Sequence, residues 1–194
     1  MNSWEIAGHT LEYFDDTHEY LVDGLLVPSI TQILKYKFGN KYDGVSKRVL
    51  NKAAEKGTEV HEAIERFCKT GESSDLKEVR NFKFLLKKYK FKVHANEVPI
   101  ILFKNDEPIA AGRLDLVLEL DDKTGGADIK RTSTLDKEYL AYQLNLYRIG
   151  YRQCYGVEWE FLKGIHLRDD IRKFVNIQIN ENMAWKLVED YLRR

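Results

Sequence analysis

Cysteine and proline are scarce in this sequence, which holds two cysteines and three prolines among 194 residues. Two thiols are too few for a disulfide framework, a zinc ribbon or a four-cysteine iron–sulfur cluster. No proline-rich hinge divides the chain, and no apolar run reaches the ~20 residues that span a bilayer. The acidic N-terminal stretch does not have the pattern of a secretory signal. We therefore expect a cytoplasmic protein that makes no contact with a membrane.

An excess of charge of either sign is also lacking. Lys and Arg total 31, Asp and Glu total 31, and the formal net charge is +0. This balance excludes a globally basic nucleic-acid coat protein, but it leaves room for a local basic groove. The sequence is 43% hydrophobic and 12% aromatic, which is enough to build a core and excludes a disordered chain.

Residue periodicity predicts a mixed α/β (α+β) fold, with helices flanking one central mixed β-sheet. The predicted strands cover residues 10–14, 20–27, 93–103, 111–120, 127–132, 157–166 and 174–179. One predicted helix begins near Ser29. The other predicted helices cover 46–56, 58–70, 74–89, 134–151 and 181–194, and Gly57 interrupts the first two of these.

The residues that point to chemistry lie on two neighbouring predicted strands. Asp128 and Lys130 are two residues apart, so they share one face of a strand, whereas Ile129 faces the other way. Asp115 lies between apolar neighbours on the preceding strand, where a lone buried charge is costly unless a cation compensates it. Two carboxylates and an ammonium brought together in this way suit Mg²⁺ or Mn²⁺. The plainer interpretation is a half-buried ion pair between Lys130 and one of the aspartates.

Two helical pairs extend this constellation. His61 and Glu65 are four residues apart and share a helix face, and a neutral imidazole can supply one more metal ligand. Gln143 and Tyr147 have the same spacing on the helix that follows Lys130, and they offer an amide and a phenol to one location. Each pair taken alone is more typical of a solvated or polar helix edge.

In combination, these motifs resemble the PD-(D/E)xK nuclease superfamily, in its RecB-like branch, which includes phage-type exonucleases. The matching segments occur in the family's order and span most of the chain: Val27-Pro28-Ser29-Ile30-Thr31, Gly57-Thr58-x-x-His61, Gly112-Arg113-x-Asp115, Asp128-Ile129-Lys130 and Gln143-x-x-x-Tyr147. Leu114 stands where many members have proline. The four cysteines of the iron–sulfur subgroup are missing, and no helicase motif is present.

The resemblance implies a restriction-endonuclease-like fold in one domain over 1–194, with an N-terminal strand–helix extension over 1–45 and a nuclease core over 46–194. It implies that one or two Mg²⁺ or Mn²⁺ ions are held by His61, Asp115, Asp128 and the carbonyl of Ile129. Lys130 matches the catalytic lysine. Gln143 and Tyr147 match the helix motif that supports the site and the DNA, so the catalytic set comprises Lys130, Asp115, Asp128, Gln143 and Tyr147.

Further charged residues complete the predicted site. Arg113 and Arg131 flank the acids and are expected to hold a scissile or neighbouring phosphate. Glu65 and Glu97 are accessory candidates: Glu65 contacts a second metal or an arginine, and Glu97 lines the rim or belongs to a solvated strand edge. The expected partners are DNA and a recombination or helicase protein of the phage or its bacterial host.

The sequence leaves three functions open. The first is a metal-dependent deoxyribonuclease, most simply an exonuclease used in DNA recombination or processing. The second is a catalytically silent protein of the same fold that binds nucleic acid or another protein. The third is an endonuclease, either structure-specific or a restriction enzyme.

A cluster of basic residues is a second candidate functional feature of the sequence. Lys83, Lys87, Lys88, Lys90 and Lys92 alternate with Phe84, Tyr89 and Phe91 without an intervening acid. This pattern is typical either of a solvated helix face or of a surface that follows a nucleic-acid backbone.

Overall fold

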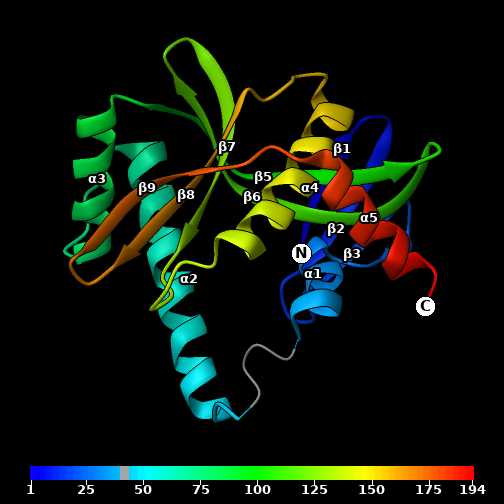
Figure 1. Cartoon of the computed structure of the whole chain (residues 1–194), viewed down its shortest axis with the longest axis horizontal. Coiled ribbons are helices and arrows are strands. Elements are labelled where there is room, and N and C mark those ends of the chain that lie inside the picture. Colours follow the sequence, from blue (N-terminus) through cyan, green and yellow to red (C-terminus); the bar gives the residue numbers. More distant parts are fainter. Residues whose placement is uncertain (40–43) are drawn as a thin grey trace.

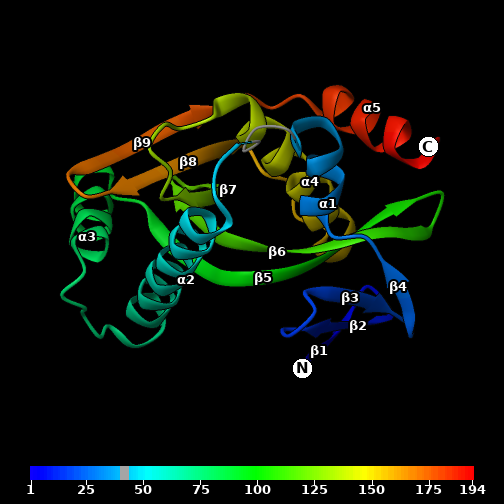
Figure 2. The ribbon, with the colours of Figure 1, turned by 90° about the horizontal axis from the view of Figure 1, so that it is seen from below.

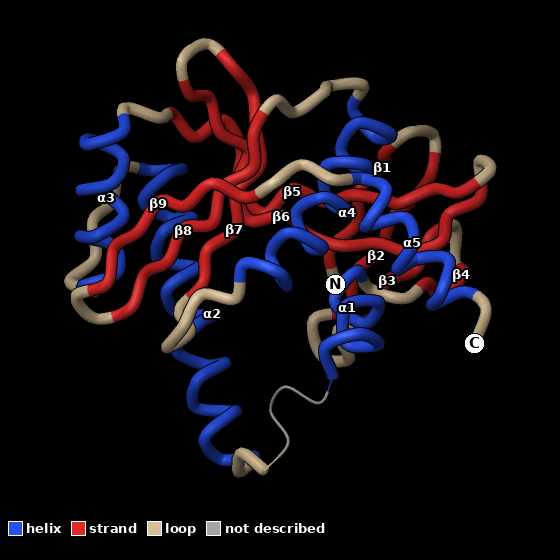
Figure 3. Tube along the Cα trace, viewed as in Figure 1, coloured by secondary structure: helices blue, strands red, loops and turns tan. Residues whose placement is uncertain are grey.

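The computed structural model describes residues 1–39 and 44–194, and in these residues it has nine strands and five helices (Figures 1 and 3). The strands are β1 (Asn2–Ile6), β2 (His9–Phe14), β3 (Glu19–Val22), β4 (Leu25–Val27), β5 (Lys92–Lys104), β6 (Glu107–Leu120), β7 (Lys123–Lys130), β8 (Phe161–Arg168) and β9 (Ile171–Ile177). The helices are α1 (Ile30–Phe38), α2 (Lys47–Thr70), α3 (Lys77–Tyr89), α4 (Lys137–Tyr155) and α5 (Glu181–Leu192). The fold is therefore mixed α+β.

The larger sheet is mixed, as the sequence predicts. It has five strands in the order β5-β6-β7-β8-β9, and only β7 and β8 run parallel. A parallel pair needs a crossover connection, and α4 supplies it. Two hydrophobic clusters cover the sheet: one includes residues of α1, α4 and α5, and the other includes residues of α2 and α3 (Figure 2).

A second sheet, which the sequence did not predict, is formed by the N-terminal strands in the order β1-β2-β3-β4. The single strand expected over 20–27 is divided by a turn at Asp23 and Gly24, whose φ angles are 52° and 77°. The turn folds the chain back, so β3 and β4 become antiparallel neighbours. This sheet packs its own apolar cluster against Ile101 and Ala111 on β5 and β6. Residues 40–43, within the predicted extension over 1–45, lie outside the described residues.

The interruption predicted at Gly57 is wrong, because α2 continues through this residue as one helix of 24 residues. Thr58 does not cap a new helix, since its hydroxyl donates a hydrogen bond to the carbonyl of Ala54 one turn earlier. A glycine inside a helix costs about 1 kcal/mol relative to alanine. Burial of Val60 and Ile64 in the following turns offsets that cost.

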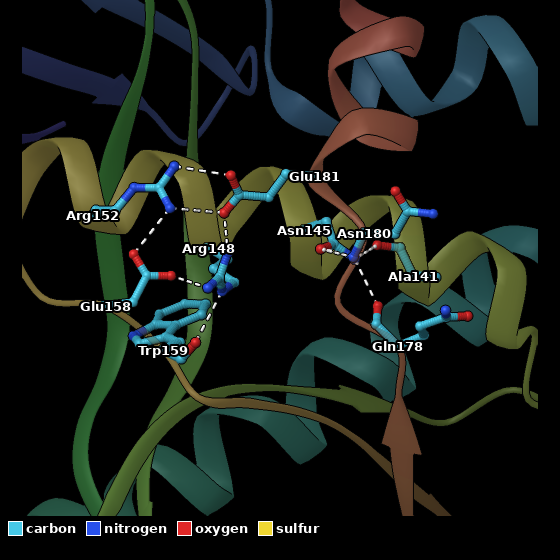
Figure 4. Close-up of polar contacts among 9 residues, drawn as sticks. All are labelled: Ala141, Asn145, Arg148, Arg152, Glu158, Trp159, Gln178, Asn180 and Glu181. Carbon is cyan, nitrogen blue, oxygen red and sulfur yellow. Dashed lines mark hydrogen bonds and ion pairs between the residues drawn. The ribbon is translucent and has the colours of Figure 1, made fainter.

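Two polar networks fix α4 against its neighbours, as Figure 4 shows. Arg148 and Arg152 both pair with Glu158, in the loop before β8, and with Glu181, the first residue of α5. One turn earlier on α4, the amide of Asn145 donates to the carbonyls of Ala141 and Gln178, and its oxygen accepts from the backbone of Asn180. These contacts set the position of the helix that carries Gln143 and Tyr147.

The remaining element boundaries differ from the sequence prediction by a few residues. The helix predicted over 134–151 is α4, and the two late strands begin at Phe161 and Ile171. None of the helices in residues 1–39 and 44–194 is both long and apolar enough to cross a membrane.

Candidate functional site

The candidate site lies where two strands of the large sheet separate. The β6–β7 ladder ends at the pair Leu116–Ala127, and its next step would pair Asp115 with Asp128. Instead of the backbone, the Asp115 carboxylate accepts the next hydrogen bond: its Oδ2 lies 2.6 Å from the backbone nitrogen of Ile129. The side chains of Asp115 and Asp128 therefore lie where the two interior strands separate.

His61, which lies on helix α2, also contacts the residues of this fork. Its Nε2 lies 3.1 Å from the carbonyl oxygen of Ile129 and donates a hydrogen bond to it. Its Nδ1 lies 3.5 Å from Asp115 Oδ1 and 3.9 Å from Glu97 Oε1. The bond to the carbonyl orients the ring, and it leaves Nδ1 facing the two carboxylates.

Glu97 is a central member of this cluster rather than a rim residue or a solvated strand edge. Its β5 neighbours pair with Leu114 and Leu116, so Glu97 lies opposite Asp115. One ligand atom each from His61, Glu97 and Asp115 lies within 4.8 Å of the others. Glu97 also has a φ of 49°, a left-handed conformation that is costly for a residue with a Cβ atom. Strain of this kind is concentrated at functional sites.

Asp128 and Lys130 lie on one face of β7, which confirms the prediction from strand periodicity. Lys130 Nζ is 2.6 Å from Asp128 Oδ2, and the Asp128 side chain is 2% exposed. The ammonium also lies 5.8 Å from the ring centroid of Tyr139 on α4. The Lys130–Asp128 contact is the half-buried ion pair of the plainer interpretation. That interpretation does not account for His61, whose Nδ1 faces Asp115 and Glu97.

The pKa values in the cluster reflect crowded negative charge. Burial raises the pKa of Asp115 to about 7, against the effect of His61 and with a further contribution from Asp128. Burial acts to lower the pKa of His61, but the carboxylates of Asp115 and Glu97 outweigh it and raise that pKa to about 9. Burial likewise opposes the charge on Lys130, yet Asp128 and Asp115 raise its pKa. The crowded carboxylates of the cluster therefore favour a bound positive charge.

Helix α4 brings Tyr147 to the same cleft, and Gly112 makes room for it. A Cβ atom on Gly112 would lie 2.9 Å from Tyr147 Cε1 and 3.3 Å from Ile30 Cδ1. Gln143, one turn earlier on α4, is buried, and its side chain acts to lower the pKa of Tyr147. Burial raises the pKa of Tyr147 well above its usual value, so the phenol is neutral. Tyr147 thus lines the cleft, and Gln143 lies one turn away on the same helix.

The two arginines of the predicted site have different environments. Arg113 Nε lies 2.7 Å from Glu97 Oε2, and its side chain is 31% exposed on the cleft. Arg131 lines a cleft beside Lys130, and its Nε lies 2.6 Å from a carboxylate oxygen of Glu78 on α3. Glu78 is 3% exposed, so this pair ties α3 to the end of β7. Glu65 lies on the cleft wall, with its carboxylate 2.5 Å from Lys69 on the same helix.

Two clefts meet at His61. The first has a volume of about 770 Å³ and contains His61, Glu97, Arg113, Asp115 and Tyr147. The second, about 810 Å³, lies on the side of Lys130 and Arg131, and both clefts include Gly57 and His61. The N-terminal sheet contributes a wall of the first cleft through Tyr13, Thr17, His18 and Tyr20, none of which the sequence analysis assigned to the site. Their positions depend on how the two sheets pack, which no local pattern indicates.

No protein-family model and no curated protein matches the sequence. A solved structure described as "Crystal structure of SSO0001" is similar to this chain, with a TM-score of 0.51 and 15% sequence identity. The match covers 86% of this chain and 75% of that chain. At this identity the similarity concerns the fold alone.

Proposed function

We propose that the chain is a metal-dependent nuclease of the PD-(D/E)xK superfamily, in its RecB-like branch, with a restriction-endonuclease-like core. The observation that carries the proposal is the convergence of His61, Glu97, Asp115, Asp128 and Lys130 at one sheet fork. These residues come from α2, β5, β6 and β7. A structural ion pair would not need a histidine and three carboxylates at one place.

The donor set fits a hard divalent cation. Carboxylate oxygens and one imidazole are ligands that Mg²⁺ and Mn²⁺ accept, and Nδ1 of His61 faces both Glu97 and Asp115. His61, Glu97 and Asp115 would hold the ion, with Asp128 next to them. A cation bound there supplies Lewis acidity and lowers the pKa of a bound water. The Ile129 carbonyl, which the resemblance adds to the ligands, accepts the hydrogen bond from His61 here.

The chain's own residues account for the remaining steps. Lys130, held by Asp128, places a positive charge where the attacking water and the phosphate oxygens meet, and so stabilises the charge that develops during hydrolysis. Arg113 is exposed on the same cleft and contacts a non-bridging phosphate oxygen. Tyr147 donates its hydroxyl hydrogen to the nucleic-acid backbone, because its raised pKa keeps it protonated. DNA is the substrate that we propose, and exonuclease cleavage is the activity.

The test is cleavage of 5′- and 3′-labelled linear DNA and of circular DNA, with Mg²⁺, with Mn²⁺ and with EDTA. We expect metal-dependent loss of label from linear DNA, and no cleavage by Lys130→Ala. Lys173→Ala removes an exposed lysine of β9 and serves as the matched control. Cleavage that persists in EDTA, or in Lys130→Ala at the wild-type rate, would refute the assignment. Binding without cleavage indicates the silent binding protein, and nicking of circles indicates the endonuclease.

A further inference from the structure

The solvent-facing side of α3 contains no acidic residue. Its exposed side chains all carry a positive charge or an aromatic ring: Lys77, Arg80, Lys83, Phe84, Lys87, Lys88 and Tyr89. The one acid in the helix, Glu78, is 3% exposed and pairs with Arg131. Lys77 pairs with the exposed Asp170, and the other four exposed cations of the helix make a local positive surface on a chain whose net charge is +0.

The two aromatic rings on this side are unusually accessible. Phe84 is 42% exposed and Tyr89 is 37% exposed. The guanidinium of Arg172, on β9, lies 3.9 Å from the centroid of the Phe84 ring. A guanidinium stacked on an exposed ring forms a flat, cationic platform, which is the arrangement on which nucleobases stack.

The dimensions of α3 suit a polynucleotide. Its 13 residues extend for about 20 Å. A nucleic-acid strand has one phosphate per ~3.4 Å, so about five or six phosphates fit alongside the helix. Arg172 and Phe174 pack against the rings of Phe84 and Tyr89, and the exposed part of each ring is a flat surface that an acidic peptide would not use.

We propose that this surface, the α3 basic–aromatic face, binds single-stranded nucleic acid. The face comprises Lys77, Arg80, Lys83, Phe84, Lys87, Lys88 and Tyr89 together with Arg172. Its cations contact phosphates, and Phe84 and Tyr89 stack on bases. It extends the proposed nuclease function but rests on a separate surface, because all of these residues lie outside the lining of the cleft at His61. The Glu78–Arg131 pair places the start of α3 next to the strand that carries Lys130.

Fluorescence anisotropy of a labelled 20-nucleotide oligothymidine in EDTA measures binding without cleavage. The test variant combines Lys83→Ala, Lys87→Ala and Lys88→Ala, which retain helix propensity on an exposed face. The matched control removes three exposed cations at the other end of the chain: Lys186→Ala, Arg193→Ala and Arg194→Ala. We expect the test variant to bind at least 10-fold more weakly, and the slope of log K against log salt to fall by about 2, which is three lost contacts at ~0.7 each. Equal effects of the two variants would overturn the proposal.

The class of ligand is tested separately. Phe84→Leu keeps an apolar side chain but loses the stacking surface, and we expect it to weaken oligothymidine binding about 5-fold or more. The wild-type protein should bind a duplex of equal length more weakly than the single strand. Unchanged binding by Phe84→Leu, tighter binding of the duplex, or displacement of the oligonucleotide by polyglutamate at equal charge concentration would each overturn the proposal.

A small substrate separates this inference from the proposed function. Bis(p-nitrophenyl) phosphate is too short to reach α3 from the fork, so its metal-dependent hydrolysis reports the site alone. We expect the triple lysine variant to hydrolyse it at the wild-type rate. If the wild-type protein fails to hydrolyse it or to cleave DNA but still binds oligothymidine through α3, the proposed function fails and the binding face stands.

Discussion

Because Glu97 has a left-handed backbone conformation, we expect the protein to be more stable with glycine than with alanine at this position. Both substitutions remove the same carboxylate and the same contact with Arg113, so their difference isolates the backbone. A φ of 49° costs an L-residue about 1–2 kcal/mol, whereas glycine in a strand costs about 0.5–1 kcal/mol relative to alanine. We expect the free energy of unfolding of Glu97→Gly to exceed that of Glu97→Ala by about 0.5–1 kcal/mol.

Urea denaturation in EDTA measures this difference, and Asn96 provides the control. Asn96 precedes Glu97 on β5 and is not among the residues with positive φ, so there alanine should be the more stable substitution by about 0.5–1 kcal/mol. Both Glu97 variants should lose metal-dependent DNA cleavage. If the free energy of unfolding of Glu97→Ala equals or exceeds that of Glu97→Gly, the backbone at this position is unstrained. Cleavage by either variant at the wild-type rate would show that the carboxylate is dispensable.

Three further predictions concern α4 and its surroundings. Gly112→Ala should destabilise the protein by about 1–3 kcal/mol and reduce cleavage, because the new methyl group displaces Tyr147; unchanged unfolding and turnover would contradict the close approach. Glu181→Gln should lower the free energy of unfolding by about 2 kcal/mol, because it removes an ion-pair partner of the mostly buried Arg148; a shift below 0.5 kcal/mol would assign the network no stabilising role. Burial raises the pKa of the Cys154 thiol to about 11, so iodoacetamide at pH 8 should label it only after unfolding; fast labelling of the folded protein, read by mass spectrometry, would contradict this.

Local pattern predicted the parts of the fold that local forces determine. The alternation around Asp128 and Lys130 follows from the two-residue period of a strand, and the structure places both side chains together. The stop at Gly71 is also local, because its φ of 76° suits a glycine cap. The continuous helix through Gly57 was missed, because the compensating burial of Val60 and Ile64 depends on tertiary packing.

The role of Glu97 was underestimated for a similar reason. Its strand alone is compatible with a solvated edge, and its alignment with Asp115 depends on the β5–β6 register. The phosphate role of Arg131, which flanks the acids, stays a prediction, but its ion pair with Glu78, 53 residues away in sequence, was not predicted. A local sequence pattern does not indicate a contact between residues so far apart in the chain. The N-terminal sheet that walls the cleft was missed for the same reason.

A crystal soaked in Mn²⁺ and measured at the manganese absorption edge locates the cation on which the proposed function depends. The donor set predicts anomalous density at the fork of β6 and β7, within about 2.0–2.4 Å of His61 Nδ1 and of carboxylate oxygens of Glu97 and Asp115. Glu97→Gln should weaken that density, whereas the control variant Lys173→Ala should leave it unchanged. Density at any other position, or a fork that stays without density at saturating Mn²⁺, would contradict the account.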